Sequence, residues 1–561
     1  MSTFSLKTRS RQTPPAGHVV SVGRGALGRS ILSVIIVVIV FGFITCLIGY
    51  FLGADLNWDL QNYHFYNGYL YTNGKLFSDS LATVQSYLDP LLNAFYYRLI
   101  SSLSPLVVNM VIAFLQSLAL VAIFFLSKHV LLDKTCRHRI LIPTLLAISA
   151  LIGPIFWSEI GGTMGDTLLA TPVIVSVFLL ARYVSLAAAG QERPVYVMLA
   201  GLAIGLVSGL KFTNMTYALS AFLSLGIILG WQKKIGIKKA AIAAAAFSVS
   251  AMVGFVIIYG HVGWLLWKHF QNPIFPYFNN IFRSPYVRPY AWHDTRWLPK
   301  SLIGYLEIPF ATFIFHTERA GGMEIGFRNS FFGLIFIFIV LSIWSRRRKE
   351  DPASPPDLGR AFLVLFFVIG FVIWAYMFGY YRYLAVLELL APGMMFIVTC
   401  SVLPKNLELS RVTAAIVVFM VALSNLPDPN WRREAFSSTY FGLRKATFKE
   451  YQHCLLIVGQ EPMGFFLPYF PSSVRVVGLP ERIGFTRKFT KHYFARLYHF
   501  SGPMYYVVRY KGSLRASIAG APSLSSYNLV ISDKCRKVAT HVFALEICAV
   551  KRVRDGQYTH T

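Results

Sequence analysis

Long apolar runs recur along the first three quarters of the chain, separated by short polar stretches. A helix needs about 20 apolar residues to cross the ~30 Å hydrocarbon core of a bilayer. Eleven segments come close to or meet this length, at roughly 31–52, 104–127, 140–157, 167–187, 195–210, 215–231, 240–262, 329–345, 361–379, 383–403 and 411–426. The sequence therefore predicts an α-helical polytopic membrane protein with about eleven transmembrane helices.

The residues after 426 follow a different pattern. Short β-rich runs alternate there with loop and helical stretches, at 454–458, 474–477, 505–508, 528–531 and 542–550. Runs of this kind are typical of strands. We therefore expect residues 427–561 to form a small α/β domain outside the membrane. Of its three cysteines, we expect Cys535 and Cys548 to form a disulfide.

The segment directly after the first apolar run, residues 54–66, concentrates acids and aromatic residues. On a helix, Asp55 and Asp59 would share a face, and Asp59 would share one with Tyr63 and Tyr66. Farther on, residues 80–101 have the apolar spacing of an amphipathic helix that lies in the membrane interface. We therefore expect residues 53–103 to form an outer loop that contains interfacial helices.

Composition supports a membrane protein and excludes other classes. Of the 561 residues, 55% are hydrophobic and 14% are charged, against roughly 25% charged residues in an average soluble domain. The mean hydropathy is +0.53. A soluble enzyme, a disordered chain and a fibrous repeat are excluded, because none of them could accommodate so much apolar surface. The net charge of +28 indicates contact with anionic lipids or anionic ligands.

Lys and Arg in the short loops determine the orientation. Residues 1–30, 128–139, 232–239 and 346–349 are rich in these residues, and eleven spans place all four stretches on the cytoplasmic side. The membrane domain then covers residues 31–426, and the outer side holds residues 53–103, 158–166, 263–328 and 427–561. The last of these has 20 Lys and Arg against 8 Asp and Glu, a net +12 that the positive-inside rule does not explain.

Several acids and cations recur at this outer face. A charged side chain at membrane depth is costly and usually has a function. The first outer loop supplies Asp55, Asp59 and His64, and the second outer turn supplies Glu159 and Asp166. The remaining candidates come from later outer junctions and from the large outer loop: they are Lys211, His261, Arg283, Arg382 and Glu388. Acids and cations on one face suggest a phosphate-bearing ligand and a general base.

Four motifs lie at defined positions relative to these spans. They are Trp58-Asp59-x-x-x-Tyr63-His64, Thr163-Met164-Gly165-Asp166, Asn272-Pro273-Ile274-Phe275-Pro276 and Arg382-Tyr383-Leu384-Ala385-Val386-Leu387. Together they resemble the GT-C superfamily of membrane glycosyltransferases, which includes protein O-mannosyltransferases and lipid A aminoarabinose transferases. Val386 stands where the superfamily usually has proline. The resemblance implies a donor sugar on a polyprenyl-phosphate carrier, and it covers about residues 30–426.

The resemblance also implies roles for individual residues. Asp59 would be the general base of an inverting displacement, with Asp55 as its rival, and Asp166 would be a second catalytic acid. Lys211 and Arg382 would bind the donor phosphate. Weaker candidates for substrate binding are Tyr63, His64, Glu159, His261, Arg283 and Glu388. The sequence assigns no metal ligands but leaves open a divalent cation.

The implied enzyme is a hexosyl or pentosyl transferase of a bacterial inner membrane, with its site facing the periplasm. Its partners would be membrane lipid, the polyprenyl-phosphate-linked sugar and a glycan or lipid acceptor, without nucleic acid. Two alternatives stay open from the residues alone. One is a transporter or flippase of lipid-linked saccharides, which charges in the middle of spans would favour. The other is an enzyme of the O-antigen polymerase or ligase type.

Overall fold

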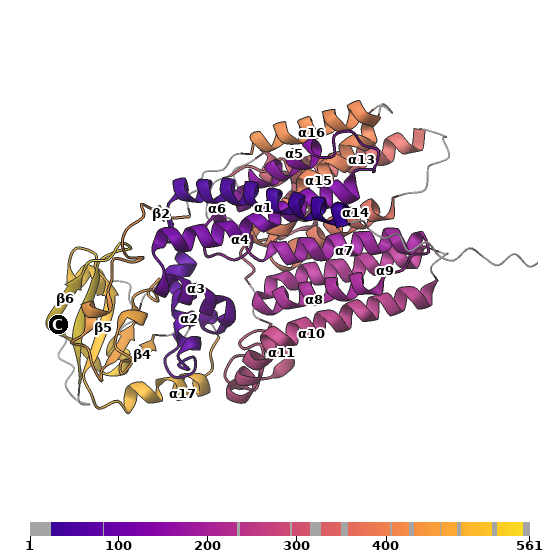
Figure 1. Ribbon diagram of the computed structural model, residues 1–561. Coiled ribbons are helices and arrows are strands. Elements are labelled where there is room, and N and C mark those ends of the chain that lie inside the picture. The colour runs from indigo at the N-terminus through magenta and orange to yellow at the C-terminus, as the bar shows by residue number, and fades with distance from the viewer. Residues whose placement is uncertain are drawn as a thin grey trace, which may run out of the picture.

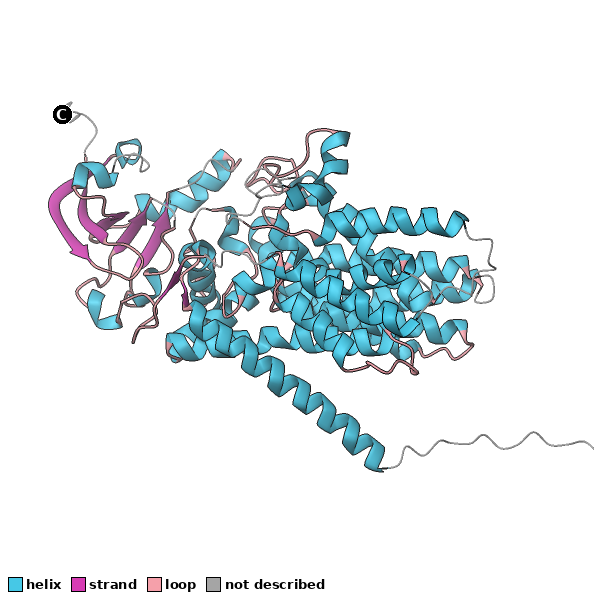
Figure 2. Cartoon of the chain, turned by 90° about the horizontal axis from the view of Figure 1, so that it is seen from above, coloured by secondary structure: helices cyan, strands magenta, loops and turns pink. Residues whose placement is uncertain are grey.

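The computed structural model describes residues 24–81, 83–232, 236–291, 294–314, 327–348, 357–403, 407–425, 431–459, 462–479, 484–518 and 524–553. The first 23 residues of the predicted cytoplasmic tail lie outside these ranges. Figure 1 shows a bundle of helices at one end of the molecule and a small sheet domain at the other. In Figure 2 the strands are gathered at the end that carries the C-terminus.

Each of the eleven predicted spans is occupied by a helix. The helices are α1 (Arg24–Leu52), α4 (Pro105–Leu126), α5 (Leu141–Leu151), α7 (Ala170–Ala188), α8 (Pro194–Leu210), α9 (Met215–Trp231), α10 (Ile237–Phe270), α13 (Phe331–Arg348), α14 (Leu358–Met377), α15 (Ala385–Val402) and α16 (Leu407–Leu423). Within the described residues, seven helices are long and apolar enough to cross a membrane, in segments that include α1, α4, α7, α9, α10, α14 and α15. Four shorter apolar helices accompany them; three lie in α5, α8 and α13, the fourth covers Leu302–Phe313 outside the predicted spans, and α16 belongs to neither group.

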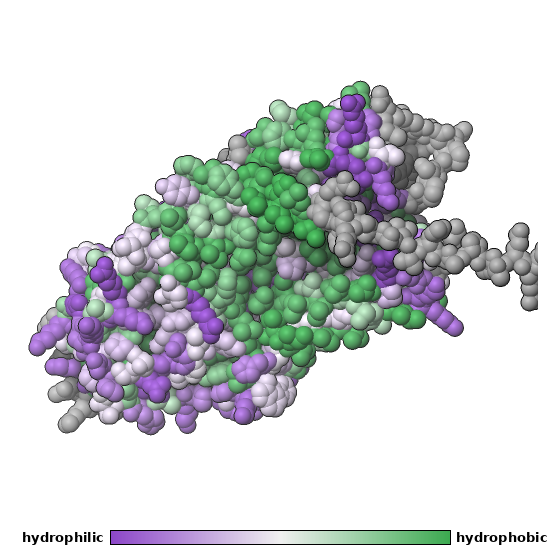
Figure 3. Space-filling model, in the orientation of Figure 1, coloured by the Kyte–Doolittle hydropathy of each residue, from purple (hydrophilic) through white to green (hydrophobic). Residues whose placement is uncertain are grey.

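The surface of the helix bundle is apolar, as expected for a bundle that crosses a membrane. In Figure 3 apolar surface covers the bundle between the polar C-terminal domain and a polar opposite end. Large apolar side chains such as Ile39 (61% exposed) and Ile257 (65% exposed) would face water if the bundle did not lie in a membrane. Inside the bundle, α8 and α10 approach closely at Gly205 and Gly254, where an added Cβ would meet the backbone of the other helix. Small residues allow such close packing between membrane helices.

Among its described residues, the first outer loop contains four helical segments, of which the last two divide the predicted amphipathic stretch at 80–101. They are η1 (Leu60–His64), α2 (Phe65–Thr72), η2 (Val84–Tyr87) and α3 (Pro90–Ser102). Asp55 lies in strand β1 (Ala54–Asp55), so the expected helical face shared by Asp55 and Asp59 does not form. The Tyr66 side chain is buried, and its hydroxyl donates to the carbonyl of Asp79. The hydrophobic pattern predicted the apolar positions of the loop but not where its helices begin and end.

The large outer loop contains two helices that the sequence did not predict, α11 (Asn279–Phe282) and α12 (Leu302–Ile314). Ahead of α11, the side chain of Asn272 donates to the carbonyl of Tyr277 and accepts from the amide of Ile274. The Asn-Pro-x-Phe-Pro motif therefore folds into a turn at the end of α10. On α12, Leu302, Ile303 and Leu306 are 76%, 67% and 68% exposed, which suits a helix in contact with lipid.

The C-terminal domain is an α/β domain, as predicted. Its five-stranded sheet has the order β4-β3-β5-β7-β6, in which the first three strands are parallel and the last two are antiparallel to their neighbours. The strands are β3 (Leu455–Val458), β4 (Arg475–Gly478), β5 (Met504–Arg509), β6 (Leu529–Val538) and β7 (Leu545–Arg552). The predicted disulfide is confirmed, and Cys535–Cys548 joins β6 to β7.

The C-terminal domain is built directly onto the first outer loop. Strand β2 (Arg433–Glu434) pairs antiparallel with β1. The amides of Gly464 and Phe465 both donate to the carbonyl of Gln61. The C-terminal domain also contacts the segment between α2 and α3, where the Tyr493 hydroxyl of α17 (Arg487–Tyr498) donates to the carbonyl of Ser80. These contacts fix the position of the first outer loop, which carries the predicted catalytic residue.

Candidate functional site

Four charged residues predicted from separate segments meet at the outer ends of the helices. Asp59 directly precedes η1, and Asp166 lies between α6 (Pro154–Glu159) and α7. Lys211 directly follows α8, and Arg382 lies in η6 (Tyr381–Leu384) between α14 and α15. We call these four residues the outer-face cluster. Each of the four residues lies at or near the end of a helical segment, so the cluster forms where these ends meet.

Ion pairs hold the cluster together. Nη1 of Arg382 donates to Oδ2 of Asp59 at 2.9 Å, and Nε of Arg382 lies 3.1 Å from Oδ2 of Asp166. Nζ of Lys211 donates to Oδ1 of Asp166 at 2.6 Å and to the carbonyl of Met164 at 2.9 Å. Both cations are buried, at 6% exposure each. A buried cation needs such partners, because losing water without compensation is very costly.

Aromatic rings surround the two cations. The guanidinium carbon of Arg382 lies 5.4 Å from the ring centre of Tyr380, 5.8 Å from that of Tyr383 and 6.0 Å from that of Trp431. Lys211 Nζ lies 5.7 Å from the ring of Tyr383. Distances near 6 Å are in the range of cation–π attraction. Trp431 belongs to the C-terminal domain, so that domain contributes one wall of the cluster.

Asp59 is strongly ionised in this setting. Burial raises the pKa of its carboxyl, but the opposing effects of Arg382, His64 and Lys211 are larger together and hold the pKa below its ordinary value. The bound proton is therefore disfavoured while Arg382 stays paired with Asp59. A carboxylate in this state is a weak proton acceptor, and a general base works best with a pKa near the working pH.

Asp89 is a further acid beside the cluster that the sequence did not single out. Burial raises its pKa to about 7, Lys211 lowers it, and Asp166 and Asp59 raise it. The residue caps α3 in a left-handed conformation, with φ +47°, just before Pro90. Non-glycine residues adopt this conformation rarely and often at functional sites. Among the described residues, the side-chain carboxylate of Asp89 has no hydrogen-bond or ion-pair partner, in contrast to that of Asp59.

Tyr63 and His64 also lie at the cluster, as predicted for substrate binding. His64 is buried, and its Nδ1 hydrogen-bonds with the side-chain oxygen of Asn93. Burial lowers the pKa of His64 to about 4, so the ring is neutral at pH 7. Its Nε2 is buried and has no hydrogen-bond partner within the described part of the chain. With the proton on Nδ1, facing the Asn93 oxygen, this Nε2 is the unprotonated nitrogen of the ring.

Asp55 and Glu159 support the cluster rather than face it. Oδ2 of Asp55 accepts from the amide and the hydroxyl of Thr163, both at 2.7 Å, and Asn57 donates to both oxygens. With all its acceptor positions in use, Asp55 ties the two acidic loops together. Oε2 of Glu159 accepts from the amide and hydroxyl of Thr167 at 3.0 and 2.9 Å, which holds the loop that presents Asp166.

Glu388 belongs to a separate buried network. Its Oε1 accepts from the amide of Ile155 at 2.7 Å, and its Oε2 accepts from the Tyr381 hydroxyl at 3.0 Å and from Asn329. The predicted contact of Glu388 with substrate is therefore not supported by its position. The residue joins α15 to the start of α6, and so helps to position Arg382, which neighbours Tyr381.

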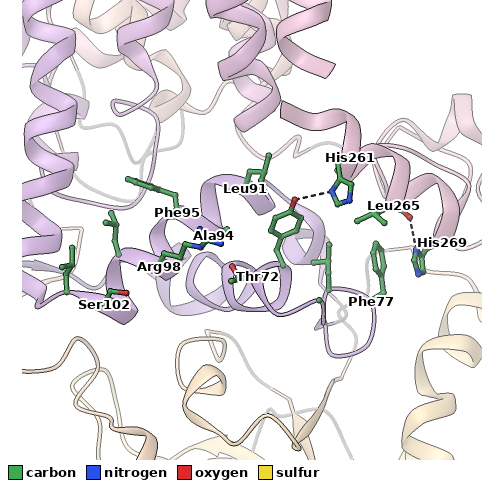
Figure 4. A pocket seen from close by; sticks show the side chains of 15 residues that line it. Thr72, Phe77, Leu91, Ala94, Phe95, Arg98, Ser102, His261, Leu265 and His269 are labelled. Atoms are coloured by element: carbon green, nitrogen blue, oxygen red, sulfur yellow. Dashed lines mark hydrogen bonds between the residues drawn. The ribbon is translucent and has the colours of Figure 1, made fainter. Parts of the chain in front are cut away.

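His261 and Arg283 lie away from the cluster. Arg283 is exposed at the end of α11. His261 is on α10, where its Nδ1 pairs with the Tyr71 hydroxyl at 3.4 Å. It lines a groove of about 970 Å³ that lies between α10 and the helices α2 and α3 (Figure 4). The groove is mostly apolar, and Figure 4 shows Arg98 and His261 as polar side chains on it. Its wall on α3 begins at Leu91, two residues after Asp89.

The acids of the cluster that face Arg382 and Lys211 do not suit the divalent cation that the sequence leaves open. Asp59 and Asp166 both face Arg382, and Lys211 contacts Asp166, so basic side chains stand where a metal ion would need the carboxylates. Among the described residues, the one group of side chains spaced to hold a metal is Cys535, Glu546 and Cys548. Its two sulfurs already form the disulfide.

The chain is similar to ArnT from Cupriavidus metallidurans. The crystal structure of that protein, bound to undecaprenyl phosphate, matches 93% of this chain and 98% of its own, with 12% sequence identity and a TM-score of 0.47. Neither the identity nor the TM-score is high enough to transfer the ligand of ArnT to this chain. No protein-family model matches the sequence, and no curated protein matches it.

Two members of the site escaped prediction for different reasons. The sequence contains a signal that could have identified Asp89, because this acid lies directly before Pro90, at the start of an amphipathic helix in the same outer loop as Asp59. Trp431 had none, because its contact with Arg382 depends on how the C-terminal domain folds back. The structure brings the four predicted residues of the cluster together, because Arg382 contacts both Asp59 and Asp166, and Lys211 contacts Asp166.

Proposed function

We propose that this protein transfers a sugar from a polyprenyl-phosphate-linked donor to an acceptor hydroxyl on the extracytoplasmic face of the membrane, with inversion at the anomeric carbon. The observation that carries the proposal is the outer-face cluster: a buried Arg and a buried Lys, beside acids of different proton affinity, at the outer ends of membrane helices. The resemblance of the motifs around Asp59, Asp166 and Arg382 to GT-C glycosyltransferases supports the same reaction.

Arg382 and Lys211 would bind the donor phosphate. In the transfer, the acceptor oxygen forms a bond to C1 of the sugar while the bond from C1 to the phosphate oxygen breaks, and the electron pair stays on the lipid phosphate. Negative charge therefore grows on the leaving group, and two preorganised cations stabilise it. Arg382 offers several N–H donors in one plane, which suits phosphate oxygens.

Phosphate binding would change the proton affinity of Asp59. In the unliganded site Arg382 is shared between Asp59 and Asp166. A phosphate that hydrogen-bonds to the Arg382 guanidinium competes with Asp59 for this cation. Asp59 then loses the strongest opposing charge, so the pKa of its carboxyl rises toward a value useful for a general base. Asp59 would then accept the acceptor's hydroxyl proton only when the donor is in place.

Asp89 is the rival for this role. Its pKa of about 7 suits a base without any change in the surrounding ion pairs. Asp55, the rival suggested by the sequence, is less suited, because its oxygens accept five hydrogen bonds in a buried position. Asp166, held by Lys211 and Arg382, would keep both cations in position.

The apolar groove between α10 and the helices α2 and α3 would hold the apolar chain of the carrier. It is walled by Leu91, Phe95 and Leu99 of α3 and by Leu265 of α10, and it starts close to Asp89. A lipid chain in this groove would bring its phosphate to the outer ends of the helices. Loading from the side would let the enzyme accept a donor that never leaves the membrane. We propose a bacterial cytoplasmic membrane as its location, with a glycan or lipid as acceptor.

The orientation is part of the proposal. The basic stretches predict that the cluster and the C-terminal domain face the outside of the membrane. The Cys535–Cys548 disulfide supports this orientation, because disulfides persist mainly in oxidising compartments.

The test is a turnover assay with a synthetic polyprenyl-phosphate sugar and membranes that contain the variants Asp59→Asn, Asp89→Asn and, as a control, Asp294→Asn. Asp294 lies in the large outer loop and pairs with Arg296 on the surface. We expect the base variant to lose at least about 100-fold in rate, and the control to keep normal turnover. Full activity in both Asp59→Asn and Asp89→Asn, at normal protein levels, would refute carboxylate catalysis at this site.

A further inference from the structure

A cavity with a charged lining lies at the opposite end of the bundle from the outer-face cluster. It has a volume of about 330 Å³ and lies between the C-terminal ends of α4 and α7 and the start of α14. Its charged lining comprises Asp133, Lys134, Arg139, Arg182 and Asp357, and His129 also lines it. The predicted topology places this cavity at the cytoplasmic surface.

Both acids of this cavity are already bound to other arginines. Asp133 pairs with Arg411, and its Oδ1 lies 3.2 Å from Arg360. Asp357 caps the first turn of α14 by accepting from the amides of Gly359 and Arg360, and it also pairs with the Arg360 side chain at 3.2 Å. These acids therefore contribute little free negative charge to the cavity.

The three cations of the cavity lack such partners. Within the described residues, Lys134, Arg139 and Arg182 form no ion pair. Arg139 donates from Nη2 to the carbonyl of Lys128 at 2.8 Å, but its Nε is buried without a hydrogen-bond partner. A buried N–H of a charged group without an acceptor is costly, and such groups are usually satisfied by a ligand, water or ion.

The positive-inside rule alone does not account for this arrangement. That rule places Lys and Arg in exposed cytoplasmic loops. Arg182, however, lies on α7 rather than in a loop, and it is half-buried together with Arg139. The two side chains come from different elements and line one cavity. Basic pockets between membrane helices at this surface suit the headgroups of anionic lipids.

We propose that the cavity lined by Lys134, Arg139 and Arg182 binds the phosphate group of an anionic ligand, with a phosphatidylglycerol or cardiolipin headgroup of the cytoplasmic leaflet as its source. The bound phosphate would accept from the free Nε of Arg139 and from Arg182, and would join the segment before α5 to α7. The site is remote from the outer-face cluster, so it does not depend on the proposed sugar transfer.

The test measures ligand binding by the purified full-length protein in a neutral detergent. Native mass spectrometry and thermal unfolding are recorded with phosphatidylglycerol, with cardiolipin, with phosphatidylcholine and with inorganic phosphate. A ligand that binds the folded state raises the unfolding temperature as its concentration rises. We expect the two anionic lipids to do so and phosphatidylcholine to have no effect. A shift with inorganic phosphate alone would identify a free phosphate as the source of the group.

The variants Arg139→Gln and Arg182→Gln should each raise the dissociation constant of the anionic lipid at least about tenfold, since each removes a charge-assisted contact. Lys134→Gln, at an exposed position, provides a second variant if an arginine change prevents folding. The matched controls Arg193→Gln and Lys238→Gln remove exposed cations on the same side but outside the cavity. Equal binding by wild type and all cavity variants, or no binding of any phosphate-bearing ligand, would overturn the proposal.

Discussion

Arg382 donates a hydrogen bond of 2.9 Å from Nη1 to Oδ2 of Asp59, although 323 positions separate the two residues in the chain. The pair joins the start of α15 to the first outer loop, and both side chains are largely buried, at 7% and 14% exposure. The same guanidinium contacts Asp166. A single cation therefore controls two acids of the outer-face cluster, and its removal should affect both stability and catalysis.

The variant Arg382→Gln should unfold more easily than the wild type. It leaves two carboxylates without their cation in a buried site, and breaking a buried pair in this way costs about 3–5 kcal/mol. Unfolding in detergent, followed by circular dichroism, measures the effect. The double variant Arg382→Gln with Asp59→Asn should recover part of the loss, because it removes one of the orphaned charges. Additive losses in the double variant would show that the two residues are not coupled.

A pH dependence of stability should come from Asp89. Its pKa rises from an ordinary 3.8 to about 7 on folding, so between these values the folded state binds more protons than the unfolded state. Stability from this group is therefore complete below pH 4 and is lost as the pH rises toward 7. The variant Asp89→Asn should gain unfolding temperature relative to the wild type at pH 7.5 but not at pH 4. A constant difference between the two proteins at all pH values would contradict this assignment.

The membrane helices could be predicted because their signal is local. A run of apolar residues is sufficient for a helix in a bilayer, where backbone groups must bond within the helix. The same holds for β3 to β7, whose apolar runs are visible in the sequence. The pairing of β1 with β2 could not be predicted, since two-residue strands leave no pattern and their partners are distant in the chain.

The sequence also gave the right face for the acids but not their roles. The motif around Tyr63 and His64 favoured Asp59 over Asp55 as the base, but the chain does not show which residues bind either acid. In the structure, Asp55 is fully engaged by Asn57 and Thr163, while Asp59 faces Arg382. Glu388 seemed a member of the site because it follows Arg382 closely, yet its helix turns it toward Ile155. Hydrogen-bond partners from other loops decide such roles, and a single sequence does not contain them.

The variant Trp431→Ala should lower turnover, since Trp431 lies over the Arg382 guanidinium and excludes water from it. Cation–π contacts contribute about 0.5–2 kcal/mol, so we expect a loss of roughly 3- to 30-fold. Trp431→Phe keeps an aromatic face and should retain most of the rate. Tyr498→Ala, an exposed aromatic of the same domain, is the control. Equal rates for Trp431→Ala and the wild type would mean that the C-terminal domain does not contribute to the site.

Filling the groove should affect long-chain donors more than short ones. Leu99→Trp adds volume to the wall that α3 contributes, so an apolar chain would lose its place. We expect the KM for a long polyprenyl donor to rise about tenfold or more, and the KM for a donor with a two-isoprene chain to change little. Leu106→Trp, at a lipid-exposed position of α4, serves as the matched control. An equal change for both donors would place the carrier chain elsewhere.

The disulfide between Cys535 and Cys548 can be tested by thiol counting. The chain has six cysteines, and Cys46, Cys136, Cys400 and Cys454 are free. The denatured, unreduced protein should therefore react with four equivalents of a thiol reagent, and with six after reduction. The bond closes a loop of 13 positions, and a loop of this size corresponds to about 3 kcal/mol of stability. The double variant Cys535→Ser with Cys548→Ser should lose about that amount.

Cys454→Ser provides the control for this measurement, because Cys454 lies in the same domain, is buried and forms no disulfide. Its loss should lower the thiol count of the unreduced protein to three and leave the bond between β6 and β7 intact. Protein isolated with an alkylating agent present from cell lysis should give the same counts, since the domain then carries the bond it acquired in the cell. Six free thiols under those conditions would contradict an oxidising compartment, and with it the proposed outer location of the C-terminal domain.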